Sequence, residues 1–313
     1  MALPSLCLLF VLSVAFSFIP FSHSLPFIVL HGINSSCTIH ETPKIVEKLT
    51  NFSGAEGHCL EVGNGVQDSW FLPMHKQVDM VCQKVKKMNI LREGYNIVGL
   101  SQGNMIARGL IEFCDGGPKV RNYISLAGPH AGVASVPECG SSSWCIRVAH
   151  LIKLAVYRDF VQEHLAPSNY VKIPDAIHDY LEKCSFLPML NNEQPDTKNS
   201  TYKKRLSSLE NLVLIMFENE TVLIPKETSW FGYYPDGSFK SVLSPNQTKL
   251  YIEDWIGLKS MDEGGKVKFI SVGGDHLQIS DKDMQKYVVP YLKRGASTKS
   301  GNVKTFVSKK LGS

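Results

Sequence analysis

A serine lies between two glycines in the sequence Gly-Leu-Ser-Gln-Gly at residues 99–103. An apolar run at 96–100 leads into this segment, and a stretch at 105–113 with apolar residues at helical spacing follows it. A serine on a sharp turn from a strand to a helix has a strained backbone, so small residues two positions before and after it prevent collisions with neighbouring elements. The pattern alone also fits a glycine-rich surface turn. Between a buried strand and an amphipathic helix, it predicts that Ser101 is a catalytic nucleophile.

A serine hydroxyl needs a base, and the usual base is an imidazole that a carboxylate orients. In the fold that carries such a serine, the chain order is serine, acid, histidine. His276 ends the sequence Gly-Gly-Asp-His at 273–276, between the last apolar run and the last helical stretch, and none of the other nine histidines combines this position with this order. We therefore expect His276 to be the base, with a hydrogen-bonded loop histidine as the alternative.

The acid is expected in the loop that follows the apolar run at 212–217. Glu220 is favoured because it lies near the end of this run and precedes an apolar stretch that would fix the loop under the histidine. Glu218 lies nearer the run, and Glu227 and Asp254 are alternatives. Each of these acids could also be a solvated surface group.

A tetrahedral intermediate needs backbone N–H donors, usually one from the residue after the nucleophile and one from the loop after an early strand. Gln102 supplies the first position. Ile33 is the simplest choice for the second, in His-Gly-Ile at 31–33, directly after the apolar run 26–30. An ordinary turn at the end of a strand is the alternative interpretation of this segment.

Six short apolar runs alternate with segments of helical spacing, which predicts an α/β fold with a mostly parallel sheet covered by helices on both faces. From 132 to 206 the pattern changes to short helical stretches, such as 146–159, interrupted by prolines, and we expect a helical insertion above the sheet. Ser280 and Asp283 resemble the cap of a final helix. The predicted strands are 26–30, 59–62, 96–100, 123–127, 212–217 and 267–272.

The composition describes a globular chain: of 313 residues 43% are apolar and 20% charged. Lysine and arginine outnumber aspartate and glutamate 33 to 29, but five of the positive residues lie in the acid-free stretch 294–313. The rest of the chain carries about −1, so its basic pI is no argument for nucleic-acid binding. We expect one domain, 25–293, followed by a disordered tail.

Residues 1–24 carry no charge and contain an apolar run at 6–21, which predicts a secretory signal peptide cleaved before Leu25. A membrane anchor is the alternative, but the run is shorter than the roughly 20 residues that a span requires. No other stretch could cross a bilayer. Five Asn-x-Ser/Thr sequons agree with entry into a glycosylating lumen.

Cleavage would remove Cys7 and leave seven cysteines, with no Cys-x-x-Cys and no paired Cys/His spacing. Disulfides are therefore favoured over a metal site, and the odd number leaves at least one thiol unpaired within the chain. The glycines of Gly-x-Gly at 63–65 lack the third glycine and the acid of a dinucleotide site. We expect neither metal nor cofactor.

With these residues placed, the sequence resembles the palmitoyl-protein thioesterases, the lysosomal kind of α/β-hydrolase, from about residue 25 to residue 292. The resemblance implies Ser101 as nucleophile, His276 as base, Ile33 and Gln102 as oxyanion donors, and an insertion that forms an acyl groove. The segments that carry it are 31–32, 94–96, 99–103, 202–204, 230–232 and 274–278.

The sequence departs from the family in two places. The acid of the family is an aspartate, and the matching position holds Glu220, which is one methylene longer; an adjacent cysteine pair of the family is reduced to Cys37. Asn199 and Asn219 resemble glycosylation positions of the family. For the cysteines, the resemblance implies the bridges Cys82–Cys114 and Cys139–Cys145, to which we add Cys37–Cys59, leaving Cys184 free.

The resemblance implies an enzyme that removes long-chain fatty acyl groups from S-palmitoylated proteins or peptides through an acyl-serine intermediate. We expect it to be a monomeric glycoprotein without a membrane span. We expect it in the secretory pathway, in the lumen of a lysosome or vacuole, or outside the cell. An acyl-CoA thioesterase or an oxygen-ester lipase with the same triad is the nearest alternative. A catalytically silent acyl-lipid carrier is an alternative of another class.

Overall fold

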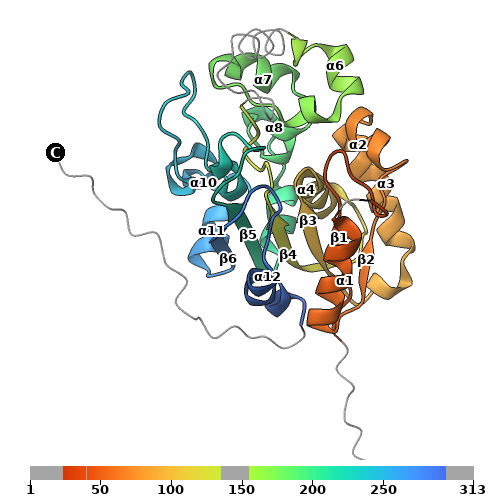
Figure 1. Ribbon diagram of the computed structural model, residues 1–313. Coiled ribbons are helices and arrows are strands. Elements are labelled where there is room, and N and C mark those ends of the chain that lie inside the picture. The colour runs from red at the N-terminus through yellow and green to blue at the C-terminus, as the bar shows by residue number, and fades with distance from the viewer. Residues whose placement is uncertain (1–23, 40, 135–154, 294–313) are drawn as a thin grey trace, which may run out of the picture.

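The computed structural model describes residues 24–39, 41–134 and 155–293, in which six parallel strands form one sheet (Figure 1). The order across the sheet is β2-β1-β3-β4-β5-β6, which confirms the predicted α/β-hydrolase fold. The expected signal peptide, except for Ser24, and the expected tail at 294–313 lie outside the described residues. The strands are β1 (Phe27–Leu30), β2 (Gly57–Cys59), β3 (Tyr95–Leu100), β4 (Val120–Leu126), β5 (Asn211–Phe217) and β6 (Val267–Val272).

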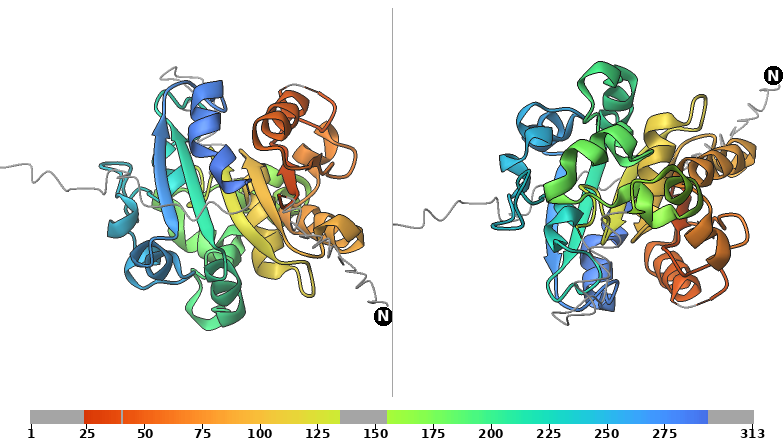
Figure 2. Two further views of the ribbon diagram at one scale, coloured as in Figure 1. Left: turned by 90° about the horizontal axis from the view of Figure 1, so that it is seen from below. Right: turned by 90° about the horizontal axis from the view of Figure 1, so that it is seen from above.

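The central strands are apolar on both faces, because helices cover both sides of the sheet. All residues of β1 and β3 are buried, and so is every residue of β5 after Asn211. Helices α1 and α12 lie on one side of the sheet, and α3, α4 and α9 on the other (Figure 2). Their bounds are α1 (Thr42–Ser53), α3 (Met74–Lys87), α4 (Gly103–Phe113), α9 (Ser200–Ser207) and α12 (Asp281–Tyr287).

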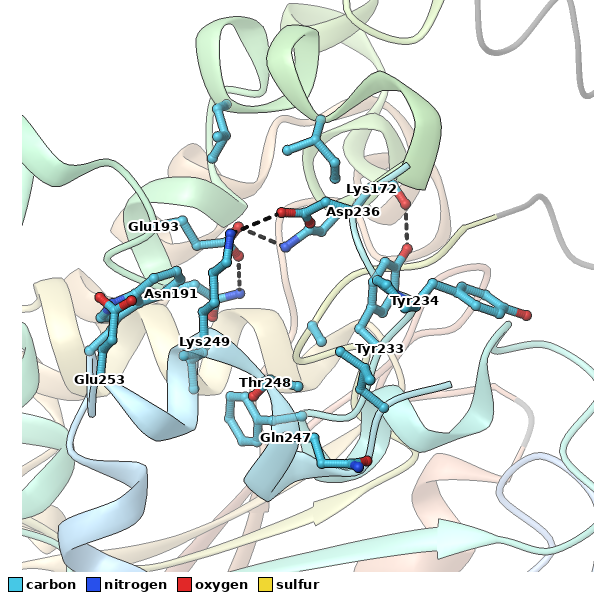
Figure 3. A pocket seen from close by; sticks show the side chains of 18 of the residues that line it. Lys172, Asn191, Glu193, Tyr233, Tyr234, Asp236, Gln247, Thr248, Lys249 and Glu253 are labelled. Carbon is cyan, nitrogen blue, oxygen red and sulfur yellow. Dashed lines mark hydrogen bonds and ion pairs between the residues drawn. The ribbon is translucent and has the colours of Figure 1, made fainter. Parts of the chain in front are cut away.

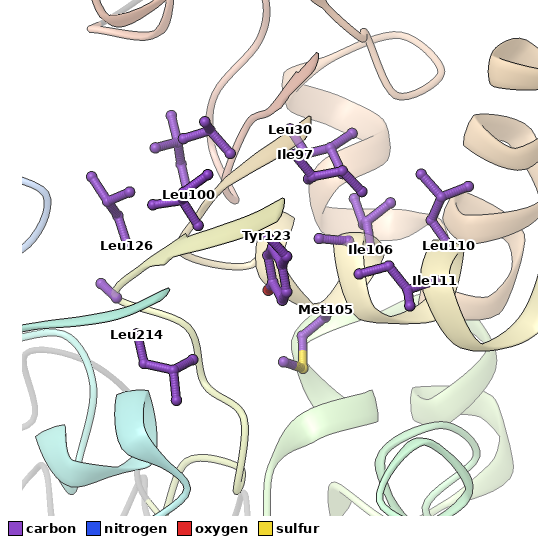
Figure 4. Close-up of a cluster of buried hydrophobic side chains, with 14 of the residues drawn as sticks. Leu30, Ile97, Leu100, Met105, Ile106, Leu110, Ile111, Tyr123, Leu126 and Leu214 are labelled. Carbon is purple, nitrogen blue, oxygen red and sulfur yellow. The ribbon is translucent and has the colours of Figure 1, made fainter. Parts of the chain in front are cut away.

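Helix α4 forms the centre of the core below the nucleophile turn, and its first ten residues are all buried. Its Met105 and Ile106 belong to the buried cluster that also contains Ile97 of β3 (Figure 4). A Cβ atom at Gly109 would collide with the side chain of Val78, so the glycine allows α3 to pack closely against α4. Each fully buried aliphatic side chain stabilises the fold by about 1.5–3 kcal/mol, so this packing fixes the helix rigidly.

The segment expected to form a helical insertion contains helices and, among its described residues, only one isolated bridge, between Val133 and Val171. Part of the helix expected at 146–159 lies outside the described residues, and α6 begins at Asp159. The described elements of the insertion are α6 (Asp159–His164), α7 (Ile177–Lys183), α8 (Leu187–Leu190), α9, and the 3-10 turns η2 (Ala166–Tyr170), η3 (Pro174–Ala176) and η4 (Pro195–Thr197). Helices α6, α7 and α8 lie above the sheet (Figure 1), whereas α9 packs against α4 on one face of the sheet.

The remaining helices are short and connect these layers. Ser280 caps α12 by accepting a hydrogen bond from the backbone N–H of Asp283, as the sequence predicts. The connecting elements are α2 (Val66–Phe71), α10 (Lys249–Ile252), α11 (Leu258–Glu263), and the 3-10 turns η1 (Asn89–Leu91), η5 (Lys226–Trp230), η6 (Pro245–Gln247) and η7 (Val289–Tyr291).

The prediction of a strand at 59–62 is wrong in its bounds, because β2 ends at Cys59. Its neighbour β1 ends at Leu30, where the chain turns into the 31–33 loop. The N–H of Leu60 still bonds to the Val29 carbonyl (3.0 Å), whereas the N–H of Val62 reaches the Nε2 atom of His31 (3.3 Å). Apolar side chains at 60–62 are buried, but no strand remains beside them to pair with.

Within the described residues, two disulfides connect neighbouring elements. Cys37–Cys59 ties the loop after β1 to β2, and Cys82–Cys114 ties α3 to the end of α4. Cys184 is a free, buried thiol, and burial raises its pKa to about 12. Cys139 and Cys145, the third expected pair, lie outside the described residues. No helix of the described part is both long enough and apolar enough to span a membrane.

Candidate active site

Ser101 occupies the turn between β3 and α4 and has a φ of 50°, in the left-handed region. Glycines on both sides make this turn possible. A Cβ atom at Gly99 would collide with the side chain of Asn104, and one at Gly103 would collide with the backbone of Leu30. Non-glycine residues hold such a backbone conformation only where the surrounding structure enforces it, and such strain clusters at active sites.

Asn104 fixes this turn from inside, a role that the sequence analysis did not identify. Its Nδ2 atom donates to the carbonyls of Ser101 (3.0 Å) and Leu126 (2.9 Å), and its Oδ1 accepts from the Tyr123 hydroxyl (2.9 Å). Asn104 is fully buried, and these bonds give both its amide nitrogen and its amide oxygen a hydrogen-bond partner, as a buried polar side chain requires. A polar residue on the buried side of the first helical turn is the only signal that the sequence offers for it.

The structure brings together the three side chains predicted to form the triad. The Nε2 atom of His276 lies 2.9 Å from the Ser101 hydroxyl, and its Nδ1 lies 2.7 and 2.8 Å from the two carboxylate oxygens of Glu220. The side chain of Glu220 is completely buried and that of His276 is 15% exposed. A serine, an imidazole and a buried carboxylate in this order can activate the hydroxyl for nucleophilic attack.

Glu220 also accepts hydrogen bonds from the backbone N–H groups of Val222 (2.8 Å) and Leu223 (3.1 Å). These bonds fix the carboxylate on a tight turn of its own loop. The alternative acids lie elsewhere: Glu218 accepts a hydrogen bond from Ser271, and Asp254 pairs with Lys203. Among the described residues, Glu220 is the only acid whose side chain contacts the imidazole of His276.

The 31–33 loop lies against the nucleophile. A Cβ atom at Gly32 would come within 3.1 Å of the Ser101 Cβ, so the loop approaches the serine too closely for a larger residue without adjustment. The backbone N–H groups of Gln102 and Ile33 donate hydrogen bonds to no other described group. Both donors are thus available for a negatively charged oxygen at the serine.

The side chain of Gln102 links the nucleophile turn to two neighbouring elements. Its Nε2 donates to the Ser69 carbonyl of α2 (2.7 Å), and its Oε1 accepts from the Tyr170 hydroxyl of η2 (2.8 Å). Sequence reasoning used only the backbone of Gln102 and missed this role. Through Tyr170, the described part of the insertion contacts the residue next to the nucleophile.

A buried ion pair attaches the insertion to α4. The guanidinium of Arg108 pairs with Glu112 (2.9 Å) and donates to the Asn191 side chain (2.6 Å) and the Leu190 carbonyl (2.9 Å). Both charged side chains are fully buried. Burial raises the pKa of Glu112 to about 7, although Arg108 acts in the opposite direction.

His130 lies next to Arg108, and its side-chain contacts are those of a structural residue. It is fully buried, its Nε2 lies 2.8 Å from the Ser125 hydroxyl, and its ring stacks on Phe231. Burial, assisted by the positive charge of Arg108, holds the pKa of His130 well below its usual range. His130 is therefore a neutral imidazole that bonds to Ser125 and not to the nucleophile.

A cavity of about 600 Å³ lies between the insertion and the 231–255 segment (Figure 3). None of the three triad side chains lines it. Because each charged lining group has an opposite partner, the cavity presents no unbalanced charge to a ligand. Its ion pairs are Lys172–Glu193 (2.8 Å), Lys249–Asp236 (3.4 Å) and Lys198–Glu253 (3.8 Å).

Comparison with known proteins places the chain in a family. The family model "Palmitoyl protein thioesterase" matches residues 26–276. Palmitoyl-protein thioesterase 1 of Caenorhabditis elegans is 36% identical over 88% of this chain and 93% of that protein, and palmitoyl-protein thioesterase 3 of Dictyostelium discoideum is 34% identical over 92% and 95%. Lysosomal thioesterase PPT2 of Mus musculus is 26% identical over 77% of this chain and 78% of that protein. The chain is a member of the palmitoyl-protein thioesterase family.

Proposed function

We propose that this serine hydrolase removes long-chain fatty acyl groups from S-palmitoylated proteins and peptides, with Ser101, His276 and Glu220 as its catalytic triad. The supporting observation is the continuous chain of hydrogen bonds from the Ser101 hydroxyl through His276 to Glu220 in a member of this family. Family membership suggests the thioester, and the geometry suggests how it is attacked.

In the first half of the reaction, the Ser101 hydroxyl oxygen attacks the thioester carbonyl carbon while Nε2 of His276 takes the hydroxyl proton. The carboxylate of Glu220 stabilises the resulting imidazolium. The N–H groups of Gln102 and Ile33 stabilise the negative oxygen of the tetrahedral intermediate. Its collapse breaks the carbon–sulfur bond, His276 returns the proton to the thiolate, and an acyl-serine remains.

In the second half, water replaces the thiol. His276 accepts a proton from the water as the oxygen attacks the acyl-serine carbonyl, and a second tetrahedral intermediate forms at the same pair of N–H groups. Collapse returns the proton to the oxygen of Ser101 and releases the fatty acid. The acyl groove implied by the family remains a prediction, because residues 135–154 of the expected insertion lie outside the described residues.

The extra methylene of Glu220 is compatible with this role. Both of its carboxylate oxygens lie within 2.8 Å of Nδ1 of His276, and the turn over 220–223 holds the carboxylate in place. We propose that the loop accommodates the longer side chain without loss of the contact that an aspartate would make. This argues against a silent carrier, for which an oriented imidazole would have no purpose.

The first experiment compares wild type and Ser101→Ala on a palmitoyl-cysteine peptide, palmitoyl-CoA and a lipid ester. We expect the peptide thioester to have the highest kcat/KM and the Ser101→Ala variant to be inactive, at least about 1,000-fold slower. Preference for palmitoyl-CoA or the lipid ester would favour the two alternative hydrolases. Failure of a fluorophosphonate probe to label Ser101 would favour the carrier.

We further propose that the protein is a glycoprotein of the secretory pathway that acts in a lysosomal or vacuolar lumen. Two disulfides suit an oxidising compartment, and relatives from Mus musculus and Xenopus laevis are named lysosomal thioesterases. Asn219 is exposed, and Asn199 caps α9 by accepting from the N–H of Thr201. Endoglycosidase treatment of Asn199→Gln and Asn219→Gln variants, with localisation of the tagged protein, tests this assignment.

A further inference from the structure

The base His276 and the acid Glu220 that orients it come from two neighbouring loops. Glu220 follows β5 and His276 follows β6, and these two strands are adjacent and parallel. The sheet ladder continues a short way past the strands, since Asn219 N–H donates to the Gly274 carbonyl (3.1 Å). Beyond that point, side chains must hold one loop against the other.

Asp275 makes the next connection between these loops. Its Oδ1 accepts hydrogen bonds from the backbone N–H (3.1 Å) and the hydroxyl (2.8 Å) of Thr221, and from the N–H of His276 (2.7 Å). Thr221 directly follows Glu220 in the chain. One carboxylate oxygen therefore joins the residue after the acid to the backbone of the base.

Three consecutive amides divide between two carboxylates at this point. Thr221 N–H donates to Asp275, whereas the N–H groups of Val222 and Leu223 donate to Glu220. The Thr221 N–H shares one planar peptide unit with the Glu220 carbonyl, so its bond to Asp275 fixes the direction in which the chain leaves Glu220 and enters the turn. The orientation of the Glu220 turn thus depends on the oxygen of Asp275.

Asp275 itself does not touch the imidazole ring by any hydrogen bond, since Nδ1 of His276 is occupied by Glu220 and Nε2 by Ser101. The bonds from the His276 amide and the Thr221 hydroxyl hold the pKa of Asp275 below its usual range. The group is accordingly a carboxylate whose contacts are structural donors rather than reacting atoms.

We propose that Asp275 is a positioning residue that clamps the loop of Glu220 to the loop of His276 and so keeps the acid in register with the base; this rests on the proposed triad. It acts only through Glu220 and His276. Its removal impairs the chemical step while leaving the binding of the acyl chain in place.

The test is a double-mutant cycle with Asp275→Ala and Glu220→Gln, read as kcat and KM on a palmitoyl thioester and as the rate of fluorophosphonate labelling. In the wild-type background, Asp275→Ala lowers kcat and the labelling rate about 10- to 100-fold with KM within about twofold, because small misplacements of catalytic groups are costly. In the Glu220→Gln background the same change costs less than about threefold, because the clamp no longer has an acid to position. Equal factors in both backgrounds overturn the proposal.

Matched variants separate the clamp from general effects. Asp281→Ala removes a nearby exposed carboxylate that pairs with Lys48, and leaves kcat unchanged. Thr221→Val removes the hydroxyl that donates to Asp275 and also destroys the glycosylation sequon at Asn219. Asn219→Gln destroys the sequon alone. We therefore expect only Thr221→Val to lower kcat. Asp275→Asn keeps an acceptor oxygen and falls between wild type and Asp275→Ala, which keeps the test decisive if the alanine variant folds poorly.

Failure of the clamp and failure of the triad give different results. If Ser101→Ala retains activity and labelling, the proposed function is wrong, whatever the cycle shows. If Ser101→Ala is inactive but Asp275→Ala costs the same factor with and without Glu220, the triad stands and the role of Asp275 is wrong.

Discussion

At the scale of single residues, the triad is held by groups that take no part in the chemistry. Asn104 fixes the turn of Ser101, and the amides of Val222 and Leu223 fix the carboxylate of Glu220. The reacting hydroxyl therefore faces a base whose position is determined before substrate binds. Such preorganisation makes the site sensitive to changes as small as one methylene.

Shortening the acid tests this sensitivity. In Glu220→Asp the carboxylate is drawn back by one methylene and cannot reach both His276 and the amides of 222–223 as it does now. We expect kcat/KM on a palmitoyl thioester to fall about 10- to 100-fold, although aspartate is the acid of the family. Glu218→Asp is the matched control, because Glu218 is exposed and touches Ser271 rather than His276. Full activity of Glu220→Asp would show that the loop, not the side-chain length, sets the contact.

At the scale of elements, α4 does two tasks. Its N-terminus presents the nucleophile, and its buried Arg108–Glu112 pair holds α8 and the residues after it through Leu190 and Asn191. A buried pair of this kind is strongly destabilising to break, because one uncompensated charge is left behind. The second carboxylate oxygen of Glu112 has no hydrogen-bond partner among the described residues, so the loss of its hydration on burial is only partly compensated.

The raised pKa of Glu112 predicts a pH-dependent stability. The folded chain binds this proton more tightly than the unfolded chain, so the stabilisation is fully present below pH 4.5 and is lost as the pH rises through about 7. Its total size is about 3 kcal/mol. Urea unfolding of wild type between pH 4.5 and pH 8 should show this decline, and Glu112→Gln should flatten it. The exposed Glu210→Gln is the control; if both variants keep the wild-type slope, Glu112 does not titrate in this range.

The disulfide between α3 and α4 supports the same helix from its other end. Cys82 and Cys114 are 32 residues apart in the chain, and closing a loop of this length stabilises the fold by about 3–4 kcal/mol in the chain-entropy model. The double variant Cys82→Ala/Cys114→Ala should lower the thermal midpoint by roughly 10 °C under non-reducing conditions. Cys184→Ala, which removes a free buried thiol, should cost about 1 kcal/mol. Equal midpoints for the two variants would contradict a stabilising bridge.

At the scale of the whole molecule, the features that could be predicted from the sequence are those that follow from alternating strands and helices. The sheet, the nucleophile turn and the meeting of Ser101, Glu220 and His276 all follow from parallel strands whose ends share one edge. The bond between Tyr170 and Gln102 and the one between Thr221 and Asp275 were not predictable. Their partners are 68 and 54 residues apart, in irregular loops and a 3-10 turn that have no periodic pattern. The bounds of β2 were missed because buried apolar residues continue past the last paired one.

The hydrogen bond between Tyr170 and Gln102 joins the insertion to the hydrolase core at the nucleophile, and a single substitution removes it. Tyr170→Phe removes the hydroxyl and leaves the buried Oε1 of Gln102 without its donor. We expect kcat to fall about 3- to 10-fold, because Gln102 also carries an oxyanion donor, and stability to fall by about 1–2 kcal/mol. Tyr157→Phe is the matched control, since its hydroxyl bonds only within the insertion, to Val171 and Ile173. It should cost similar stability and no kcat, whereas equal losses of kcat in both variants would mean that the insertion acts on the site only through its overall folding.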